Sequence, residues 1–190
     1  MVKVLIFDNY DSFTYNLVHQ VEKLLHVRVD VCKNDETDLR KISLFDKIIL
    51  SPGPGIPDEA GSLKQIVKEF SATKSILGVC LGNQAIGEVF GGKLLNLKTV
   101  FHGVAHEIEI LDSNEIIFSG MEKRQTVGRY HSWVIDQDGF PDELSITAID
   151  EFNNVMAVRH NSFDVCGIQF HPESILTPNG EKMISNWLFH

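Results

Sequence analysis

The first half of the chain alternates between short apolar runs and segments with helical periodicity. The apolar runs are typical of buried strands and lie at 2–7, 27–32, 47–51 and 75–79. The run at 27–32 alternates apolar and polar residues with period two, which suits a strand at a sheet edge or a strand with one polar face. Helices are expected between them, over 13–25, over about 62–70 and from 83 onward. Strands alternating with helices predict a mainly parallel, open α/β sheet covered by helices on both faces.

The second half is richer in extended segments. Strands are predicted at 104–111, 115–118, 145–150, 155–159 and 165–170, and a helix at 180–190. The chain contains no repeat, low-complexity segment or linker. We therefore expect one α/β domain over residues 1–190, with antiparallel strands added in its second half.

Composition and charge narrow the functional classes. The 190 residues carry 26 acidic and 17 basic side chains, a formal net charge of −9, without a cluster of Lys or Arg. This excess disfavours a nucleic-acid surface and suits an enzyme that acts on small molecules or docks on a protein. We expect no signal peptide and no membrane span. Three widely spaced cysteines (Cys32, Cys80, Cys166) argue against a disulfide framework or zinc site and favour reduced thiols in the cytoplasm.

The stretch GVCLG at 78–82 has the spacing of a nucleophile elbow, with Cys80 at the turn from strand to helix. Flanking glycines remove the Cβ atoms that would clash in such a turn, and the following helix directs its N-terminus at the thiol, which favours the thiolate. The N–H of Leu81 would be free to face an oxyanion. Alternatively, Cys80 is a small core residue whose glycine neighbours permit tight packing. The pattern alone leaves both interpretations open.

A nucleophilic thiol needs a base and a group that orients the base. His171 ends the apolar strand at 165–170, and in an extended His-x-Glu segment Glu173 lies on the same side as the ring. The alternative is a surface loop with an incidental ion pair. Other histidines lie in polar contexts where a solvated side chain is expected, among them His19, His26 and His160.

The stretch SPGPG at 51–55 follows another apolar strand. Its prolines and glycines predict a rigid, kinked loop whose remaining N–H groups point outward. Such a loop can supply a second oxyanion donor and a wall for the substrate. By itself it could equally be an ordinary turn before a helix.

Taken in order, these elements resemble the class I (triad) glutamine amidotransferases, and more narrowly the small glutaminase subunits of anthranilate synthase and aminodeoxychorismate synthase. The resemblance covers the whole chain. The motifs that carry it are FDNYDSFTYNL at 7–17, SPGPG at 51–55, GVCLGNQAI at 78–86, YHSW at 130–133 and GIQFHPESILTPNG at 167–180. The family's fold, with its flavodoxin-like layering, agrees with the periodicity.

The resemblance implies a triad of Cys80 as nucleophile, His171 as general base and then acid, and Glu173 as the group that orients the imidazole. It also implies sites for glutamine and its oxyanion, at Gly53, Pro54, Gly55, Leu81, Gln84, Ser132 and Trp133. Two positions depart from the family. Asn83 stands where histidine is usual, which implies altered hydrogen bonding around the site rather than lost chemistry. Val104 stands where lysine is common, which removes support for any detail of partner docking there.

The resemblance further implies a partner. Ammonia released from glutamine needs an acceptor, and 190 residues leave no room for a second catalytic domain, so we expect a separate synthase subunit that binds chorismate and needs magnesium. No metal or cofactor is expected in this chain. The tryptophan and folate branches stay open, as do a stand-alone γ-glutamyl hydrolase and a non-catalytic binding module. A flavodoxin-like nucleotide binder is disfavoured because no phosphate loop follows the first strand.

Overall fold

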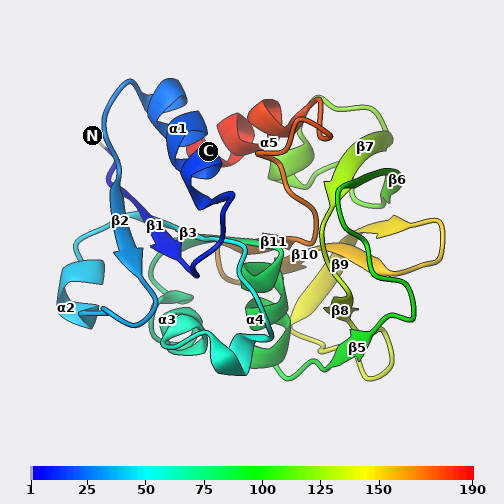
Figure 1. Ribbon diagram of the computed structural model, residues 1–190, viewed down its shortest axis with the longest axis horizontal. Coiled ribbons are helices and arrows are strands. Elements are labelled where there is room, and N and C mark those ends of the chain that lie inside the picture. The colour runs from blue at the N-terminus through cyan, green and yellow to red at the C-terminus, as the bar shows by residue number, and fades with distance from the viewer. Residues whose placement is uncertain (1) are drawn as a thin grey trace.

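A nine-stranded sheet runs through the computed structural model, which describes residues 2–190, in the strand order β2-β1-β3-β4-β11-β10-β9-β6-β7 (Figure 1). Neighbouring strands in its first part are parallel: β2 (Asp30–Lys33), β1 (Val4–Asp8), β3 (Lys47–Leu50), β4 (Ser75–Val79) and β11 (Val165–Ile168). Its second part is antiparallel: β10 (Val155–His160), β9 (Leu144–Asp150), β6 (Val104–Ile110) and β7 (Arg124–Arg129). This arrangement confirms the predicted fold class, and it places β2 at a sheet edge, which is one of the two settings that its alternating pattern suits.

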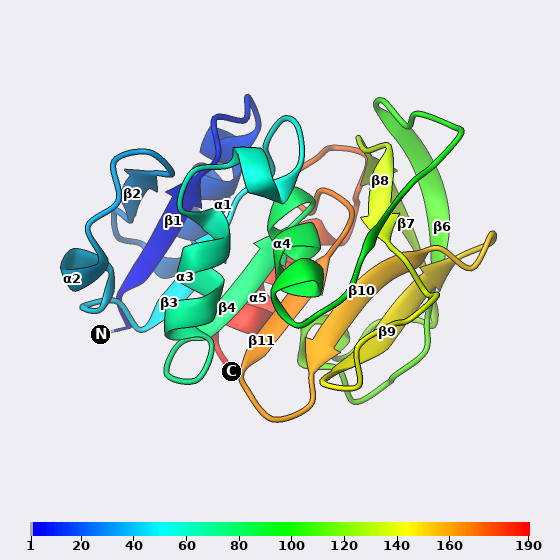
Figure 2. The same ribbon diagram turned by 90° about the horizontal axis from the view of Figure 1, so that it is seen from below.

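Helices cover both faces of the parallel strands because alternate side chains of each strand point to opposite faces. In β1, Val4 and Ile6 join the cluster that contains α1 (Thr14–Leu25) and α5 (Gly180–Leu188). Leu5 and Phe7 join the cluster with α3 (Leu63–Phe70) and α4 (Leu81–Val89). Figure 2 is seen from the α3 and α4 side and shows these two helices in front of the parallel strands. The core is thus split into two layers by the sheet.

The prediction of a strand at 115–118 is wrong. These residues form a short 3-10 helix, η2 (Ile116–Phe118), which the Glu115 carboxylate caps by accepting the N–H of Ile117 at 3.2 Å. The same carboxylate pairs with the guanidinium of Arg159 at 2.6 Å. An apolar run of this length does not distinguish a strand from a buried helical turn, and here a cap and an ion pair decide.

Several elements had no counterpart in the sequence prediction. Strand β7 has few apolar residues, so its sequence shows no strand pattern. Its antiparallel hydrogen bonds to β6 hold it in the extended conformation. The others are short: α2 (Leu39–Ile42), η1 (Pro57–Glu59), and a separate two-stranded sheet of β5 (Leu94–Asn96) and β8 (Trp133–Ile135). Elements of three or four residues leave too little periodicity to detect.

His160 was expected to be solvated, and that prediction is wrong. It is buried at the end of β10, with its ring stacked on Phe163 at a centroid distance of 4.3 Å. Its Nδ1 atom accepts the N–H groups of Ser162 and Phe163. The imidazole therefore closes a turn, whereas His19 and His26 are exposed as expected.

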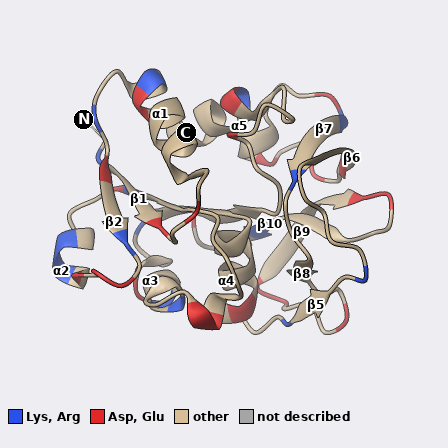
Figure 3. Cartoon of the chain, viewed as in Figure 1, with Lys and Arg blue, Asp and Glu red and all other residues tan. Residues whose placement is uncertain are grey.

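Charged residues are interspersed around the molecule in the view of Figure 3, with acidic segments at several loops and helix ends. The pair of Arg129 and Asp150 lies inside, with both side chains fully buried. Among residues 2–190, no helix combines the length and the hydropathy that crossing a membrane would require.

Candidate active site

Cys80 occupies the junction between β4 and α4 in a conformation that non-glycine residues rarely adopt, with φ 52° and ψ −99°. Its N–H donates to the carbonyl of Ile168 in neighbouring β11 at 2.8 Å, and its own carbonyl accepts the N–H of Gln84 at 3.1 Å. Both bonds hold the strained turn in place. Strain of this kind is characteristic of nucleophile elbows, and packing of a small core residue does not require it.

Gly78 and Gly82 allow the chain to turn here without collision. A Cβ atom on Gly78 would lie 2.5 Å from the carbonyl carbon of Gly82, and one on Gly82 would lie 2.5 Å from the carbonyl oxygen of Leu50. The first turn of α4 therefore lies directly against β3 and β4. The glycines thus permit close packing, and that packing shapes the turn at Cys80.

His171 and Glu173 follow β11 at the carboxyl edge of the sheet. The Nδ1 atom of His171 lies 2.7 Å from Oε1 of Glu173, and the side chains are 2% and 0% exposed. The His171 N–H donates to the carbonyl of Gly128 at 3.0 Å, and the Thr177 hydroxyl donates to the His171 carbonyl at 2.6 Å. The imidazole is thus fixed through its backbone and through one ring nitrogen.

The other ring nitrogen of His171 is available to the thiol. Burial lowers the pKa of His171, but the adjacent Cys80 and Glu173 side chains outweigh it and raise the pKa to about 10. Within the described residues, Nε2 is buried and makes no hydrogen bond, so it is left to face the thiol. The rings of Tyr130 and Phe13 pack on the imidazole at centroid distances of 4.7 and 5.6 Å. The structure therefore brings Cys80, His171 and Glu173 together in one buried site.

The loop at 51–55 lies beside the elbow and is anchored by Asn9. The Asn9 N–H donates to the Ser51 hydroxyl at 2.9 Å, and the Asn9 side-chain amide donates to the Ser51 carbonyl at 2.8 Å. A Cβ atom on Gly53 would lie 2.6 Å from both Asn9 and Leu81. The first βα turn of the chain and the elbow thus enclose Gly53.

This loop can contribute few hydrogen-bond donors. Pro54 has no N–H, and Gly55 adopts a φ of +72°, which suits glycine. Among the described residues, the N–H groups of Gly53 and Leu81 have no hydrogen-bond acceptor. The N–H of Gly55 has no acceptor among those residues either, and unpaired donors next to a nucleophile are the usual composition of an oxyanion hole.

The predicted glutamine-binding residues come from two elements that meet near the elbow. The Gln84 side-chain amide, in the first turn of α4, donates to the carbonyl of Trp133 at 2.9 Å. Ser132 accepts the N–H of Leu97 through its carbonyl at 2.7 Å. The structure thus joins Gln84 to the 132–133 segment, which the sequence could not indicate.

The two departures from the family pattern, Asn83 and Val104, lie in different surroundings. Asn83 is fully buried and donates through Nδ2 to the Gln169 side-chain oxygen at 3.2 Å. Gly167 makes room for it, because a Cβ atom there would lie 2.3 Å from the Asn83 oxygen. Val104 lies at the start of β6 on the rim of an apolar groove of about 480 Å³ that also includes Val100 and Phe152. The first departure adjoins the site, and the second lies at the surface.

Sequence reasoning missed Gln169. Its Nε2 atom lies 3.6 Å from the Cys80 sulfur, and the side chain is fully buried. The available signal was a polar residue within an apolar strand, two positions before His171. An unpaired amide in a core strand is unfavourable, so its presence there indicates polar partners.

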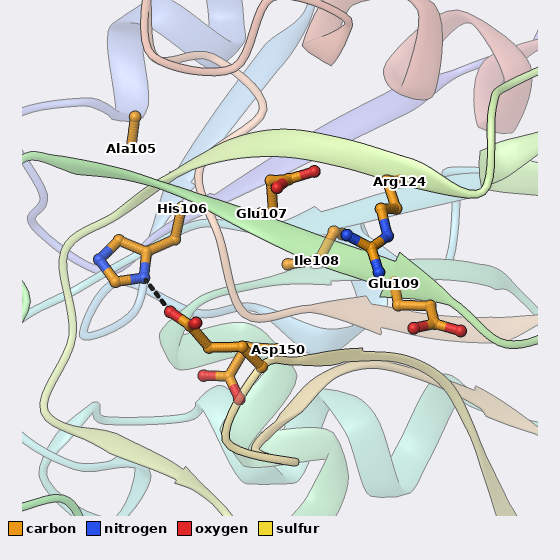
Figure 4. Close-up of a pocket in the computed structure, with 8 residues that line it drawn as sticks. Ala105, His106, Glu107, Ile108, Glu109, Arg124 and Asp150 are labelled. Carbon is orange, nitrogen blue, oxygen red and sulfur yellow. Dashed lines mark ion pairs between the residues drawn. The ribbon is translucent and has the colours of Figure 1, made fainter.

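A separate hollow of about 340 Å³ lies on the antiparallel part of the sheet and includes none of the predicted site residues (Figure 4). Within it, His106 faces Glu151 with a nitrogen-to-oxygen distance of 3.9 Å. No group of three or more His, Cys, Asp or Glu side chains in residues 2–190 is arranged to hold a metal ion. The candidate chemistry is therefore concentrated around Cys80.

Comparison with known proteins gives the same family. The sequence model of the family described as "Glutamine amidotransferase class-I" matches residues 5–190. The chain is 41% identical to "Anthranilate synthase component 2" of Pseudomonas aeruginosa, over 97% of this chain and 94% of that protein. It is also 41% identical to "Aminodeoxychorismate synthase component 2" of Escherichia coli, over 97% of this chain and 98% of that one.

A third relative is longer. The "Bifunctional protein TrpGD" of Thermotoga maritima is 39% identical over 98% of this chain, and the chain spans 32% of its length. Among solved structures, a Thermoplasma acidophilum protein assigned to GMP synthase as one of its subunits matches with a TM-score of 0.88 and 26% identity, over 100% of this chain and 93% of that one. These matches confirm the resemblance found in the motifs: the chain belongs to the class-I glutamine amidotransferase family.

Proposed function

We propose that this protein is the glutaminase subunit of a chorismate-using synthase, and that Cys80, His171 and Glu173 carry out its chemistry. The observation that carries the proposal is one buried arrangement: a cysteine in a strained strand-to-helix turn beside an imidazole whose far nitrogen is held by a carboxylate. Family membership supports glutamine as the substrate.

In the first half-reaction, the Cys80 thiolate attacks the side-chain amide carbon of glutamine and forms a C–S bond. The negative oxygen that develops is received by the N–H groups of Leu81 and of the Gly53–Gly55 loop. Protonated His171 gives its Nε2 proton to the departing nitrogen, the C–N bond breaks, and ammonia leaves. The raised pKa of His171 supports this role, because the ring is then protonated before glutamine arrives.

In the second half-reaction, water attacks the γ-glutamyl thioester. His171 accepts one proton from the water and the C–S bond breaks, which regenerates the Cys80 thiolate beside protonated His171. The new carboxyl group gives the second proton to solvent, and the product leaves as glutamate. Glu173 holds the imidazole in one orientation in both halves and stabilises its positive charge. Gln84 and the Ser132–Trp133 segment bind the glutamine, which the contact of Gln84 with the Trp133 carbonyl supports.

The proposal includes a partner. The relatives from P. aeruginosa and E. coli are both named component 2, which supports a separate synthase subunit that receives the ammonia. Ammonia is mostly protonated at neutral pH and is then not nucleophilic, so its transfer has to be shielded from water. We place chorismate and magnesium in that subunit, no cofactor in this chain, and the complex in the cytoplasm, where free thiols stay reduced.

The proposal leaves two candidates for the synthase, anthranilate synthase and aminodeoxychorismate synthase, and the relatives support both equally. The anthranilate and aminodeoxychorismate relatives have the same identity to this chain, 41%. The product of the complex, anthranilate or aminodeoxychorismate, distinguishes the tryptophan branch from the folate branch. One chain serving both is the third outcome.

The experiment measures ammonia release from glutamine, with and without each candidate synthase subunit, for the wild type and Cys80→Ser. The wild type should be stimulated by its partner, and Cys80→Ser should lose release while the complex still makes product from added ammonium chloride. Undiminished release in Cys80→Ser would overturn the mechanism. Release that no synthase subunit stimulates would favour a stand-alone hydrolase, and no release under any condition would favour a binding module.

A further inference from the structure

Gln169 is a buried side chain that touches the reacting sulfur. It follows β11 directly, its backbone N–H donates to the Met156 carbonyl at 2.9 Å, and its Nε2 atom lies 3.6 Å from the Cys80 sulfur. The side chain has no solvent exposure. Whether this contact is a donated hydrogen bond depends on which end of the amide faces the sulfur.

The surrounding hydrogen bonds fix that orientation, starting from a backbone carbonyl. The Trp133 carbonyl can only accept, so the Gln84 atom 2.9 Å from it is the donor nitrogen. The same nitrogen lies 3.4 Å from Gln169, which makes the contacted atom of Gln169 the oxygen. Asn83 donates to that oxygen as well, at 3.2 Å. With its oxygen held by two amides, Gln169 can direct only its NH₂ group at the sulfur.

The Trp133 carbonyl is in turn the end of a buried chain of hydrogen bonds in which each donor and each acceptor can be assigned. His131 lies 3.0 Å from it through Nδ1, which must therefore carry the hydrogen. The Nε2 atom of His131 then accepts from Nε of Arg129 at 3.1 Å, and Arg129 pairs with Asp150 at 2.7 Å. Burial, followed by the Arg129 charge, lowers the pKa of His131 to about 3, so the ring is neutral as this chain requires.

We propose that Gln169 is a second hydrogen-bond donor to the Cys80 thiolate, beside His171, and that Asn83 and Gln84 are the positioning residues that aim its amide at the sulfur. The inference rests on the proposed function, because it concerns the same nucleophile. A bond to a charged acceptor is stronger than one to a neutral acceptor, so this contact stabilises the thiolate more than the thiol. Asn83, where the family usually has histidine, serves here as an amide that holds Gln169.

The test uses Gln169→Glu in the full chain. The carboxylate keeps the shape of the side chain and can still accept from Asn83 and Gln84, but it presents a negative oxygen to the sulfur. His171, the titratable group that faces Cys80, and its partner Glu173 are left in place. The measurement is the rate at which iodoacetamide alkylates Cys80 between pH 5 and 10 without glutamine, with the labelled peptide identified by mass spectrometry to exclude Cys32 and Cys166.

We expect the pH midpoint of Cys80 alkylation to move up by at least about one unit, and the rate below the midpoint to fall at least about tenfold, because the variant loses one charge-assisted hydrogen bond and adds a negative charge beside the sulfur. The matched control is Gln125→Glu. Gln125 is another buried glutamine, bonded to the Glu122 carbonyl and to Asn179, and its replacement should leave the midpoint unchanged. A wild-type midpoint in folded Gln169→Glu, or an equal shift in the control, would overturn the proposal.

A measurement on the wild type covers the case in which the variant does not fold. In ¹⁵N-labelled protein, the side-chain amide signals of Gln169 should shift over the same pH range as Cys80 alkylation, and Cys80→Ser should abolish that shift. An unchanged shift in Cys80→Ser would contradict the contact. Alkylation does not need turnover, so a protein that releases no ammonia yet shows the Gln169 effect would contradict the proposed function and support this inference.

Discussion

The Nδ1 atom of His171 lies 2.7 Å from Oε1 of Glu173, in a pair of side chains that solvent does not reach. The carboxylate stabilises a positive charge on the imidazole and keeps Nε2 directed away from itself. Because the contact is buried, water cannot replace either partner when it is lost.

Glu173→Gln keeps the size of the side chain and removes its charge. We expect kcat for glutamine hydrolysis, measured with the synthase partner, to fall on the order of 10²-fold, the lower end of what acid–base catalysis contributes. The pKa of His171 should fall as well, since Glu173 raises it in the wild type. The unfolding midpoint serves as the control for folding. An unchanged kcat would rule out an orienting role for Glu173.

Because His131 is buried and its pKa is lowered, we expect the protein to lose stability in acid. Its pKa in the folded state is lowered from 6.5 to about 3, so its contribution to the free energy of unfolding is fully present above about pH 6.5 and is lost as the pH falls toward 3. The slope from this group is at most about 1.4 kcal/mol per pH unit. Urea unfolding of His131→Gln between pH 4 and 7 should show a shallower pH dependence than the wild type. The same substitution at exposed His19 should leave the slope unchanged.

The Arg129–Asp150 pair predicts a large effect from loss of one partner. Arg129→Met leaves a fully buried carboxylate without its cation, which costs about 3–5 kcal/mol of unfolding free energy. Replacing both partners should cost less than the sum of the single changes, because no uncompensated charge remains. The control is Lys23→Met in the exposed pair with Glu181, where we expect less than about 1 kcal/mol. Equal losses at the two sites would contradict the buried geometry.

We expect the turn at Cys80 to be sensitive to any atoms added at its two glycines. Gly78→Ala and Gly82→Ala each place a methyl group 2.5 Å from backbone atoms, and overpacking of this kind costs about 1–3 kcal/mol. We expect glutaminase activity to fall together with stability, because relief of the clash displaces Cys80. Gly139→Asn provides the control, since that site is open and asparagine tolerates its positive φ of 70°. Wild-type activity in either alanine variant would show that the elbow adapts without cost to the site.

Much of the fold followed from local patterns. The apolar runs and helical spacing predicted the five parallel strands and the helices α1, α3, α4 and α5 that cover them, because burial on a sheet or helix face leaves a period that short windows retain. The same patterns failed at η2, where a capping carboxylate and an ion pair from Arg159 chose a helical turn, and at β7, where pairing with β6 compensates for a weak apolar pattern. The ion pair and the strand pairing involve partners outside the short window in which a periodic pattern is read.

The contacts in the candidate site also fall into two groups, those that the local sequence indicates and those that only the tertiary structure creates. Neighbours in sequence indicate the turn of GVCLG and the contact of Glu173 with His171, because each involves only a few consecutive residues. The bond from the Cys80 N–H to the Ile168 carbonyl, which helps to hold the turn, depends on the pairing of β4 with β11. The contact of Gln169 with the Cys80 sulfur joins residues 89 positions apart, and the direction of its amide is set by the carbonyl of Trp133 on a third segment. No local pattern contains such information, because a hydrogen bond between distant residues exists only once the sheet has brought its strand ends together.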